Sequence, residues 1–200
     1  MKYLSLITAL GMAFMLNSCY EIDSLASNTS GYMFKTDGQL RNPNQRVSDG
    51  FWDRPAGLEG AHVIVIDRRL QNAKYYINGT QVGLSTCSTG SEGRGTPAGT
   101  YKVLSKDEDH RSSKYGSWVN KETGEVMQLD FTLGQSTPIA GGEYLGAPMF
   151  YGLQLNTTGI WMHEGIVTSA PESHGCIRLP SKMAKVFFDN IPVGSQVIVR

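Results

Sequence analysis

Ser173-His174-Gly175-Cys176 places a histidine two positions before a cysteine, and these two residue types can perform nucleophilic chemistry together. A thiol attacks a carbonyl carbon as the thiolate, and a free cysteine is mostly protonated at neutral pH. An imidazole within hydrogen-bond distance can take that proton and activate the sulfur. Cys176 is therefore the candidate nucleophile, and the base must be found among the histidines.

The chain has four histidines that could act as the base. His62 opens an apolar run and is expected to be structural, and His110 lies in a charged segment. In an extended backbone the β-carbons of His174 and Cys176 are about 7 Å apart, so direct proton transfer needs a bend at the intervening glycine. His163 ends a separate predicted strand and can approach the thiol from any direction. Geometry favours His163 and leaves His174 open.

Other interpretations of these residues remain. Zinc accepts nitrogen and sulfur ligands, so His163, His174 and Cys176 could form a metal site. The i, i+2 spacing is unusual for zinc, and the chain has neither a CxxC nor an HExxH motif, so no metal is predicted. A buried, inert thiol is the second alternative for Cys176. Cys87 is expected to be a small core residue, with a regulatory disulfide to Cys176 as its alternative.

Short β-branched runs and turn residues predict the strands that position these groups. The predicted strands cover residues 61–67, 74–77, 80–82, 101–104, 150–155, 160–163 and 196–199. Asn78-Gly79 predicts a tight hairpin turn, and a second hairpin is expected around residues 121–124. These strands predict a mainly β, sandwich- or barrel-like domain.

One helix is predicted near the C-terminus. It is expected to be capped by Ser181 and to run to about Asp189. Met183, Val186 and Phe187 fall on one face of this helix, which should therefore pack against the sheet.

The composition limits the possible partners. The chain has 200 residues, 18 basic and 18 acidic side chains and no net charge. This length is enough for one domain with a hydrophobic core. A nucleic-acid partner would need a basic surface, and none is indicated.

The N-terminus has the layout of a secretory signal, with Lys2, a mostly apolar run and then small residues. The run is shorter than the roughly 20 residues that span a bilayer. Leu16-Asn17-Ser18-Cys19 resembles a lipobox, so Cys19 is expected to carry lipid and to anchor the protein to a membrane. An ordinary signal peptide with a chance cysteine is the alternative. Residues 1–18 are thus predicted to be a signal peptide, residues 19–58 a flexible tether and residues 59–200 the folded domain.

The spacing around the candidate nucleophile resembles a known family. His163-Glu164-Gly165 and the run Ser173–Arg178, with nine residues between His163 and Ser173, resemble the L,D-transpeptidase catalytic domain (the YkuD type). Further matching segments are Val63–Asp67, Ser88–Gly90, Thr96–Tyr101, His110–Gly116, Lys185–Phe188 and Val193–Val197. The resemblance covers roughly residues 61–200.

The resemblance implies roles for individual residues. Cys176 would be the nucleophile and His163 the base, oriented by the carbonyl of Glu164. His174 would line the site, and the backbone N–H groups of Gly175 and Cys176 would form the oxyanion hole.

Substrate contacts are implied for Ser173, Gly175 and Arg178. Arg178 could bind a peptide carboxylate or pair with a structural acid, Glu172 or Asp189. Many family members have a longer gap after the base and His-Asn where this chain has Ile177-Arg178, and these departures affect substrate choice.

The implied function is a cell-envelope peptidoglycan L,D-transpeptidase that needs no cofactor. Its partners would be stem peptides and a membrane reached through Cys19, on the periplasmic face if the envelope has two membranes. Polar residues 105–148 would cover the cleft. Hydrolysis of the same acyl-enzyme, by an L,D-carboxypeptidase or an amidase, is one alternative. A non-catalytic, wall-binding lipoprotein is the other.

Overall fold

The structure is a computed structural model that describes residues 35–36, 39–40, 50–168 and 170–200. The chain divides into two units, Met1–Arg46 and Val47–Arg200. In the first unit, β1 (Lys35–Thr36) pairs with β2 (Gln39–Leu40) in antiparallel fashion. The predicted signal peptide and Cys19 lie outside the described residues. Within the part of the chain that is described, no helix has the length and apolar character needed to cross a membrane.

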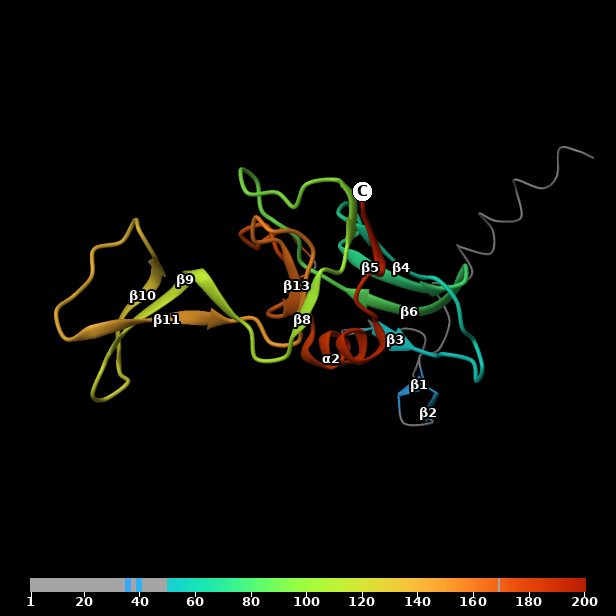
Figure 1. The fold of residues 1–200 in the computed structure, drawn as a ribbon, viewed down its shortest axis with the longest axis horizontal. Helices are drawn as coiled ribbons and strands as arrows, with labels where there is room; N and C mark the ends of the chain where they lie inside the picture. The colour runs from blue at the N-terminus through green and yellow to red at the C-terminus, as the bar shows by residue number, and fades with distance from the viewer. Residues whose placement is uncertain (1–34, 37–38, 41–49, 169) are drawn as a thin grey trace, which may run out of the picture. The chain divides into compact units, whose positions relative to one another are not determined.

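A six-stranded sheet forms the larger layer of the second unit (Figure 1). In spatial order its strands are β3 (Gly50–Trp52), β6 (Thr80–Thr86), β5 (Asn72–Ile77), β4 (His62–Asp67), β15 (Gln196–Val199) and β7 (Gly99–Lys102). β15 and β4 are parallel, and the other neighbours are antiparallel. The predicted Asn78-Gly79 turn joins β5 to β6, and both residues have the positive φ that such a turn requires (47° and 79°).

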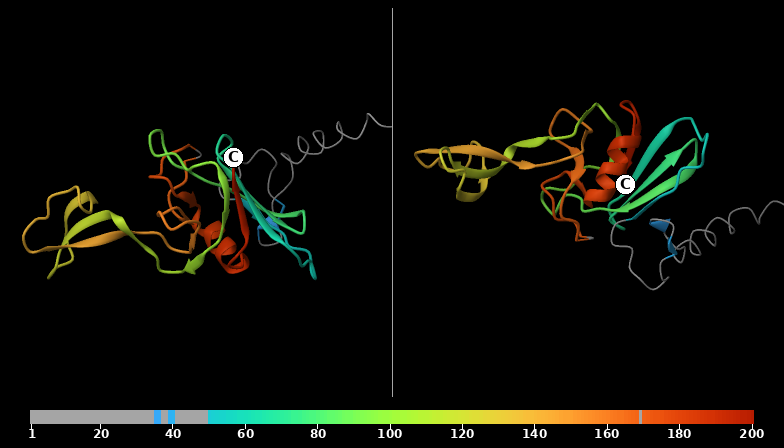
Figure 2. Two further views of the ribbon diagram at one scale, coloured as in Figure 1. Left: turned by 45° about the horizontal axis from the view of Figure 1, so that its top comes forward. Right: turned by 90° about the horizontal axis from the view of Figure 1, so that it is seen from below.

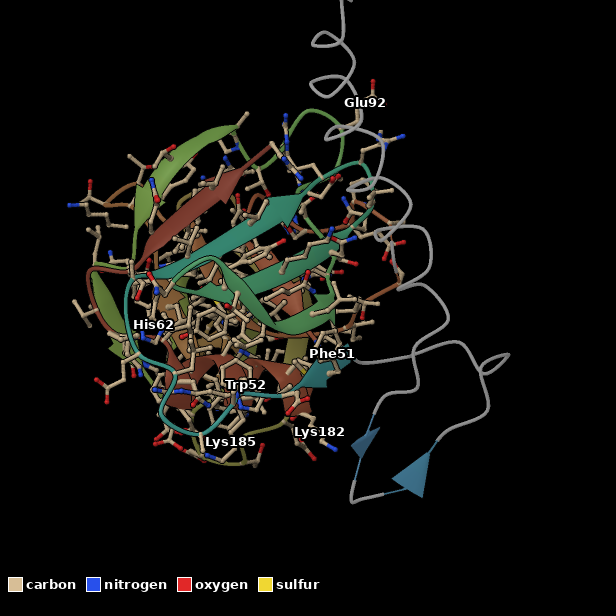
Figure 3. All side chains as sticks on the ribbon, turned by 90° about the vertical axis from the view of Figure 1, so that its right-hand side faces the viewer. Phe51, Trp52, His62, Glu92, Lys182 and Lys185 are labelled. Atoms are coloured by element: carbon tan, nitrogen blue, oxygen red, sulfur yellow. The ribbon has the colours of Figure 1, made fainter. Side chains whose placement is uncertain are left out.

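The folded part of the chain begins earlier than residue 59, the predicted start of the domain. β3 adds to the edge of the six-stranded sheet through β6. The Trp52 ring packs against Tyr75, with 5.0 Å between the ring centroids. Phe51 and Trp52 lie on the same side of the domain as Lys182 and Lys185 of the helix (Figure 3). Residues 50–52 therefore belong to the fold, although the sequence analysis placed them in the tether.

A four-stranded sheet forms the second layer. Its order is β14 (Ile177–Leu179), β13 (Trp161–Glu164), β12 (Gly152–Gln154) and β8 (Ser105–Asp107). β13 and β14 run parallel, while the other pairs are antiparallel. Neither of these sheets closes on itself, so the fold is an open, mainly β sandwich rather than a barrel.

The helix α2 (Ser181–Asn190) packs in the core beside the six-stranded sheet (Figure 2). Met183 and Phe187 are buried, and the Phe187 ring lies 5.5 Å from Tyr75. The predicted cap at Ser181 is wrong, because Pro180 is the N-cap residue and no side chain caps the helix.

The hydrophobic core lies between the two layers and α2. Its fully buried members come from both sheets and include Ile64, Ile66, Tyr75, Ile77, Leu153, Met162, Ile177, Leu179 and Val197. Most of these residues lie in the apolar and β-branched runs that predicted strands. Their burial is the main force that holds β13 and β14, and so the site, against the larger sheet.

A separate three-stranded sheet is formed by β10 (Val126–Thr132), β9 (Arg111–Asn120) and β11 (Gly142–Pro148). The hairpin expected around residues 121–124 joins β9 to β10. The Phe131 ring is buried between Trp118 and Tyr144, with centroids 4.7 and 6.2 Å away. The segment predicted to cover the cleft is thus divided: β8 joins the four-stranded sheet, and residues 111–148 build the additional sheet.

Candidate active site

Two parallel strands place the candidate base and nucleophile on one surface. Met162 of β13 pairs with Ile177 of β14, and both side chains are fully buried in the core. Because side chains alternate along a strand, His163 must point to the opposite face from Met162. Arg178, its register partner, lies on that same face. Cys176 immediately precedes Ile177 and lies diagonally across from His163.

The His163 imidazole is held in one tautomer. Its Nδ1 lies 2.5 Å from the carbonyl oxygen of Glu164, which can only accept, so Nδ1 carries the hydrogen. Nε2 is then the unprotonated nitrogen. Burial lowers the pKa of His163 to about 4. The charges of Arg178 and His110 also lower this pKa, whereas the hydrogen bond to Glu164 raises it. His163 is therefore neutral at pH 7 and able to accept a proton.

The Cys176 thiol is half-buried and donates to the carbonyl oxygen of Gly159 at an S···O distance of 3.4 Å. Burial raises its pKa, although a hydrogen bond from the backbone of Trp161 and the charge of Arg178 oppose this. No hydrogen bond joins Cys176 to His163 within the described residues. The thiol must therefore leave the Gly159 carbonyl before it can donate its proton to the imidazole. Catalytic hydrogen bonds are often long or absent without substrate and form when the substrate binds.

Ser173 and Thr96 hold the loop that carries the cysteine. The Ser173 hydroxyl donates to the carbonyl of Cys176 (2.5 Å) and accepts from the N–H of Gly175 (3.1 Å). Thr96 Oγ1 donates to the carbonyl of Gly175 at 2.8 Å. This bond orients the Gly175–Cys176 peptide and turns the Cys176 N–H to its opposite side.

These bonds change two expected roles. Ser173 is 2% exposed and its hydroxyl is used inside the loop, whereas a substrate contact was expected. The Gly175 N–H is already bonded to Ser173, so of the two expected oxyanion donors only the Cys176 N–H could still serve. Gly175 has φ +116°, a conformation that favours glycine, and this explains the residue type at the bend.

Gln71 and Thr89 support the loop that carries Cys176 through hydrogen bonds. The sequence analysis did not identify either residue as part of the site. The buried Gln71 amide donates to Thr89 Oγ1 and accepts from the Thr89 N–H, both at 2.8 Å. The Thr89 carbonyl accepts from the N–H of Ser173 at 3.0 Å. Such long-range contacts leave no local sequence signal; only the family resemblance of Ser88–Gly90 pointed to this segment.

His174 lies at the surface of the loop that carries Cys176. It is exposed, and its ring stacks on Tyr115 of β9 with 4.4 Å between the centroids. The three-stranded sheet therefore contacts the site directly through Tyr115. Partial burial lowers the pKa of His174, as do the charges of Arg94 and Arg178, while Asp130 raises it.

His110 also lies close to the site, although its sequence context suggested only a charged loop. Its ring stacks on Trp161 with a centroid separation of 3.7 Å, and Nδ1 pairs with Asp107 at 3.0 Å. Trp161 precedes the buried part of β13 and lies beside Cys176 in the parallel register. His110 and Trp161 thus form one wall of the site.

The alternatives for the other candidates can now be compared with the geometry. Asp189 pairs with Lys185 at 2.8 Å, and the described residues include no ion pair for Arg178. Neither do they include a group of three or more histidine, cysteine or acidic side chains arranged for a metal ion. Cys87 is fully buried, as predicted, and its pKa is raised to about 12; it and Cys176 are both free thiols.

Comparison with known proteins identifies a family. Residues 61–199 match the family profile of the L,D-transpeptidase catalytic domain. A search of curated proteins found no relative of this chain.

Solved structures share this fold. An L,D-transpeptidase from Mycobacterium smegmatis is 20% identical with a TM-score of 0.54, over 70% of this chain and 59% of that one. L,D-transpeptidase 3 from Mycobacterium tuberculosis, in complex with a faropenem-derived adduct, is 21% identical with a TM-score of 0.53, over 70% and 60%. An L,D-transpeptidase from Stackebrandtia nassauensis is 18% identical with a TM-score of 0.50, over 74% and 58%. This chain thus spans less than two thirds of the length of these structures.

Proposed function

The chain belongs to the L,D-transpeptidase catalytic domain family, and from this premise we propose that it is a peptidoglycan L,D-transpeptidase with Cys176 as the nucleophile and His163 as the base. The observation that carries the proposal is the Nδ1 bond of His163 to Glu164, on the same face of the sheet as Cys176. A buried, neutral imidazole with a fixed tautomer is a suitable proton acceptor for a neighbouring thiol.

The proposed reaction has two halves. Cys176 passes its proton to Nε2 of His163 and attacks the carbonyl carbon of the third residue of a stem tetrapeptide. The C–N bond to the terminal D-alanine then breaks, and the imidazolium returns the proton to the leaving amine. An acceptor amine attacks the thioester, loses its proton to His163 and releases the sulfur, which is reprotonated. The Cys176 N–H, which lies on the side of the peptide opposite the Thr96 bond, would stabilise the oxyanion in both halves.

The test is acyl-enzyme formation with a disaccharide tetrapeptide. We expect the full chain in mild detergent to gain the mass of the acyl group at Cys176 and to release D-alanine. Faropenem is a second probe, since a relative from M. tuberculosis was solved with a faropenem-derived adduct. Cys176→Ala should gain no mass with either probe, and Cys87→Ala is the matched control that should still be acylated.

The products distinguish the alternatives. A cross-linked dimer would support transpeptidation, whereas the tripeptide alone would indicate an L,D-carboxypeptidase. A folded protein that binds wall peptides but is never acylated would refute the catalytic proposal and favour a wall-binding protein.

We further propose that the protein is anchored in the cell envelope by lipid on Cys19. The lipobox-like run Leu16–Cys19 motivates this. Growth with an alkyne fatty acid should label the wild type, while Cys19→Ala should be unlabelled and released from membranes. Labelling that persists in Cys19→Ala would contradict the anchor.

A further inference from the structure

Arg178 is a cationic side chain on the same face of the sheet as the nucleophile. Ile177 and Leu179 on either side of it are buried in the core, so Arg178 points the other way, beside its register partner His163. Its aliphatic stem crosses Gly165, where Cγ and Cδ lie 3.0 Å from the position that a Cβ would occupy. The side chain is therefore half-buried against β13.

Arg94 is a second cationic residue held against the same loop. The N–H and the hydroxyl of Ser91 both donate to the carbonyl of Ser173, at 3.0 and 3.2 Å, and Arg94 closes the turn by donating to Ser91. The Arg94 carbonyl lies 3.6 Å from the position of a Cβ on Gly175. The turn thus fixes Arg94 next to the glycine that precedes Cys176.

These two arginines have no acidic partner among the described side chains, whose ion pairs are His110–Asp107 and Lys185–Asp189. Their charges reach the site, because both lower the pKa of His174, and Arg178 also lowers that of Cys176. Asp130 is the acidic group that acts on His174 in the opposite direction. Arg178 is half-buried, whereas the side chain of Arg94 is exposed. A guanidinium without a counter-ion favours the binding of an anion, and most strongly where it is half-buried, as Arg178 is.

We propose that Arg94 and Arg178 together bind a carboxylate of the substrate beside Cys176. The planar guanidinium matches a carboxylate through paired, charge-assisted hydrogen bonds. The inference rests on the proposed function, because it takes a stem peptide as the substrate. Such a peptide offers two carboxylates near the scissile bond: the terminal one of D-alanine, and the side-chain one of a diaminopimelate third residue.

The first test uses alkylating reagents instead of a peptide. The Cys176 thiolate attacks the same carbon of iodoacetate and of iodoacetamide and displaces iodide from each. The two reagents differ in charge, so the ratio of their rates at Cys176 reports the binding of a carboxylate. Peptide mass mapping of the full chain measures each rate. Arg178→Gln and Arg94→Gln should each lower the iodoacetate-to-iodoacetamide ratio, by about threefold to tenfold. Arg54→Gln, an exposed arginine whose guanidinium donates to the Leu58 carbonyl, is the charge-matched control and should leave the ratio unchanged.

An unchanged ratio in either arginine variant would overturn the two-arginine site. This result does not depend on peptidoglycan chemistry. If the ratio falls in both variants while no tetrapeptide acylates the wild type, the carboxylate site stands and the proposed function fails.

The second test identifies which carboxylate is bound. Acylation rates are compared for the tetrapeptide, its C-terminal carboxamide, and a version with lysine replacing diaminopimelate. The wild type should be slower with the peptide that lacks the recognised carboxylate, by about tenfold, and both arginine variants should discriminate less. Equal wild-type rates for all three peptides would contradict the proposal.

Discussion

Cys176 and His163 are both held in their neutral forms by burial, so the resting site is a thiol beside an imidazole instead of a preformed ion pair. Burial raises the pKa of the thiol and lowers that of the imidazole. Desolvation always disfavours the charged form, and it acts on both partners here. In the proposed reaction the proton transfer therefore accompanies attack on the substrate, and the free-enzyme pKa values should be visible in pH profiles.

The rate of acylation should depend on the protonation of His163. Because the pKa of His163 is about 4, the base stays neutral down to mildly acidic pH. We expect the rate of acyl-enzyme formation to be flat from about pH 6 to 8 and to fall by half only near pH 4. Intact-mass kinetics across this range will measure it, and His174→Asn should keep the same midpoint. A midpoint near 6.5 would show that a different histidine is the base.

The free energy of unfolding should also depend on the protonation of His163. The unfolded imidazole titrates near 6.5 and the folded one near 4, so the unfolded state binds more protons between these values. The free energy of unfolding therefore falls as the pH drops through this window, by about 2 kcal/mol from pH 7 to pH 5. Urea unfolding of the wild type and of His163→Asn measures the difference. If the wild type and His163→Asn lose the same free energy of unfolding between pH 7 and pH 5, the pH dependence does not come from His163.

Between the strands, a hydrogen-bonded loop sets the geometry of the nucleophile. Thr96 is fully buried, and its hydroxyl links the N–H of Gly90 (2.9 Å) to the carbonyl of Gly175 (2.8 Å). One hydroxyl therefore joins the segment after β6 to the peptide that precedes Cys176. If the hydroxyl is replaced by a methyl group, the side-chain volume hardly changes. The Gly90 N–H and the Gly175 carbonyl then stay buried without this hydrogen-bond partner.

We predict that Thr96→Val lowers both stability and acylation. The unpaired Gly90 and Gly175 groups should cost about 2 kcal/mol in the free energy of unfolding, and the freed Gly175–Cys176 peptide should slow acylation about tenfold. Thr96→Ser keeps the hydroxyl and is the matched control. Urea unfolding and intact-mass kinetics will report both effects. If Val and Ser variants behave alike, the hydroxyl does not orient the loop.

The three-stranded sheet meets the site at Tyr115. An aromatic stack of this kind is worth about 0.5–1.5 kcal/mol, so Tyr115→Ala should slow acylation by the tetrapeptide up to about tenfold. Tyr115→Phe keeps the ring over His174 and should retain the rate. The rate at which iodoacetamide alkylates Cys176 reports thiol reactivity without substrate positioning. This rate should change little in Tyr115→Ala. A large change in the alkylation rate would show that Tyr115 affects the reactivity of the thiol instead of the position of the substrate.

At the scale of the whole second unit, the core explains why the site is rigid. Met162, Ile177 and Leu179 are buried in the sandwich, so β13 and β14 cannot shift without exposing apolar surface to water. On the far side of this core, β3 extends the sheet and Trp52 packs on Tyr75. The edge strand thus contributes to the same folding unit as the catalytic strands.

Truncation of Trp52 should destabilise the unit without altering its chemistry. The ring is half-buried, so we expect Trp52→Ala to lower the free energy of unfolding by about 2 kcal/mol. Trp52→Phe retains an aromatic contact with Tyr75 and should lose about half as much. The iodoacetamide reactivity of Cys176 in the folded state should not change. A stability equal to that of the wild type would exclude β3 from the cooperative unit.

The sequence by itself predicted the class of fold and many of the strands, although not β3, β8 or β14. It also singled out Cys176 and His163 as the candidate pair, which stays a prediction. The β-branched runs, the Asn78-Gly79 turn and the motif spacing are local signals, so they can be recognised in the sequence without the tertiary structure. The helix was also predicted, but the cap predicted at Ser181 was wrong, because Pro180 is the N-cap residue and proline has no side-chain hydrogen-bonding group.

Only the tertiary structure decided which polar groups are used within the fold and which remain open to a substrate. Ser173 proved to be a loop anchor, Thr96 and Gln71 joined the site from distant segments, and His110 and Tyr115 came to stack beside it. These contacts join residues far apart in the chain, and no periodicity or spacing encodes them. They follow from the packing of the two sheets, because the core sets the distances between segments and hydrogen bonding then selects the partners.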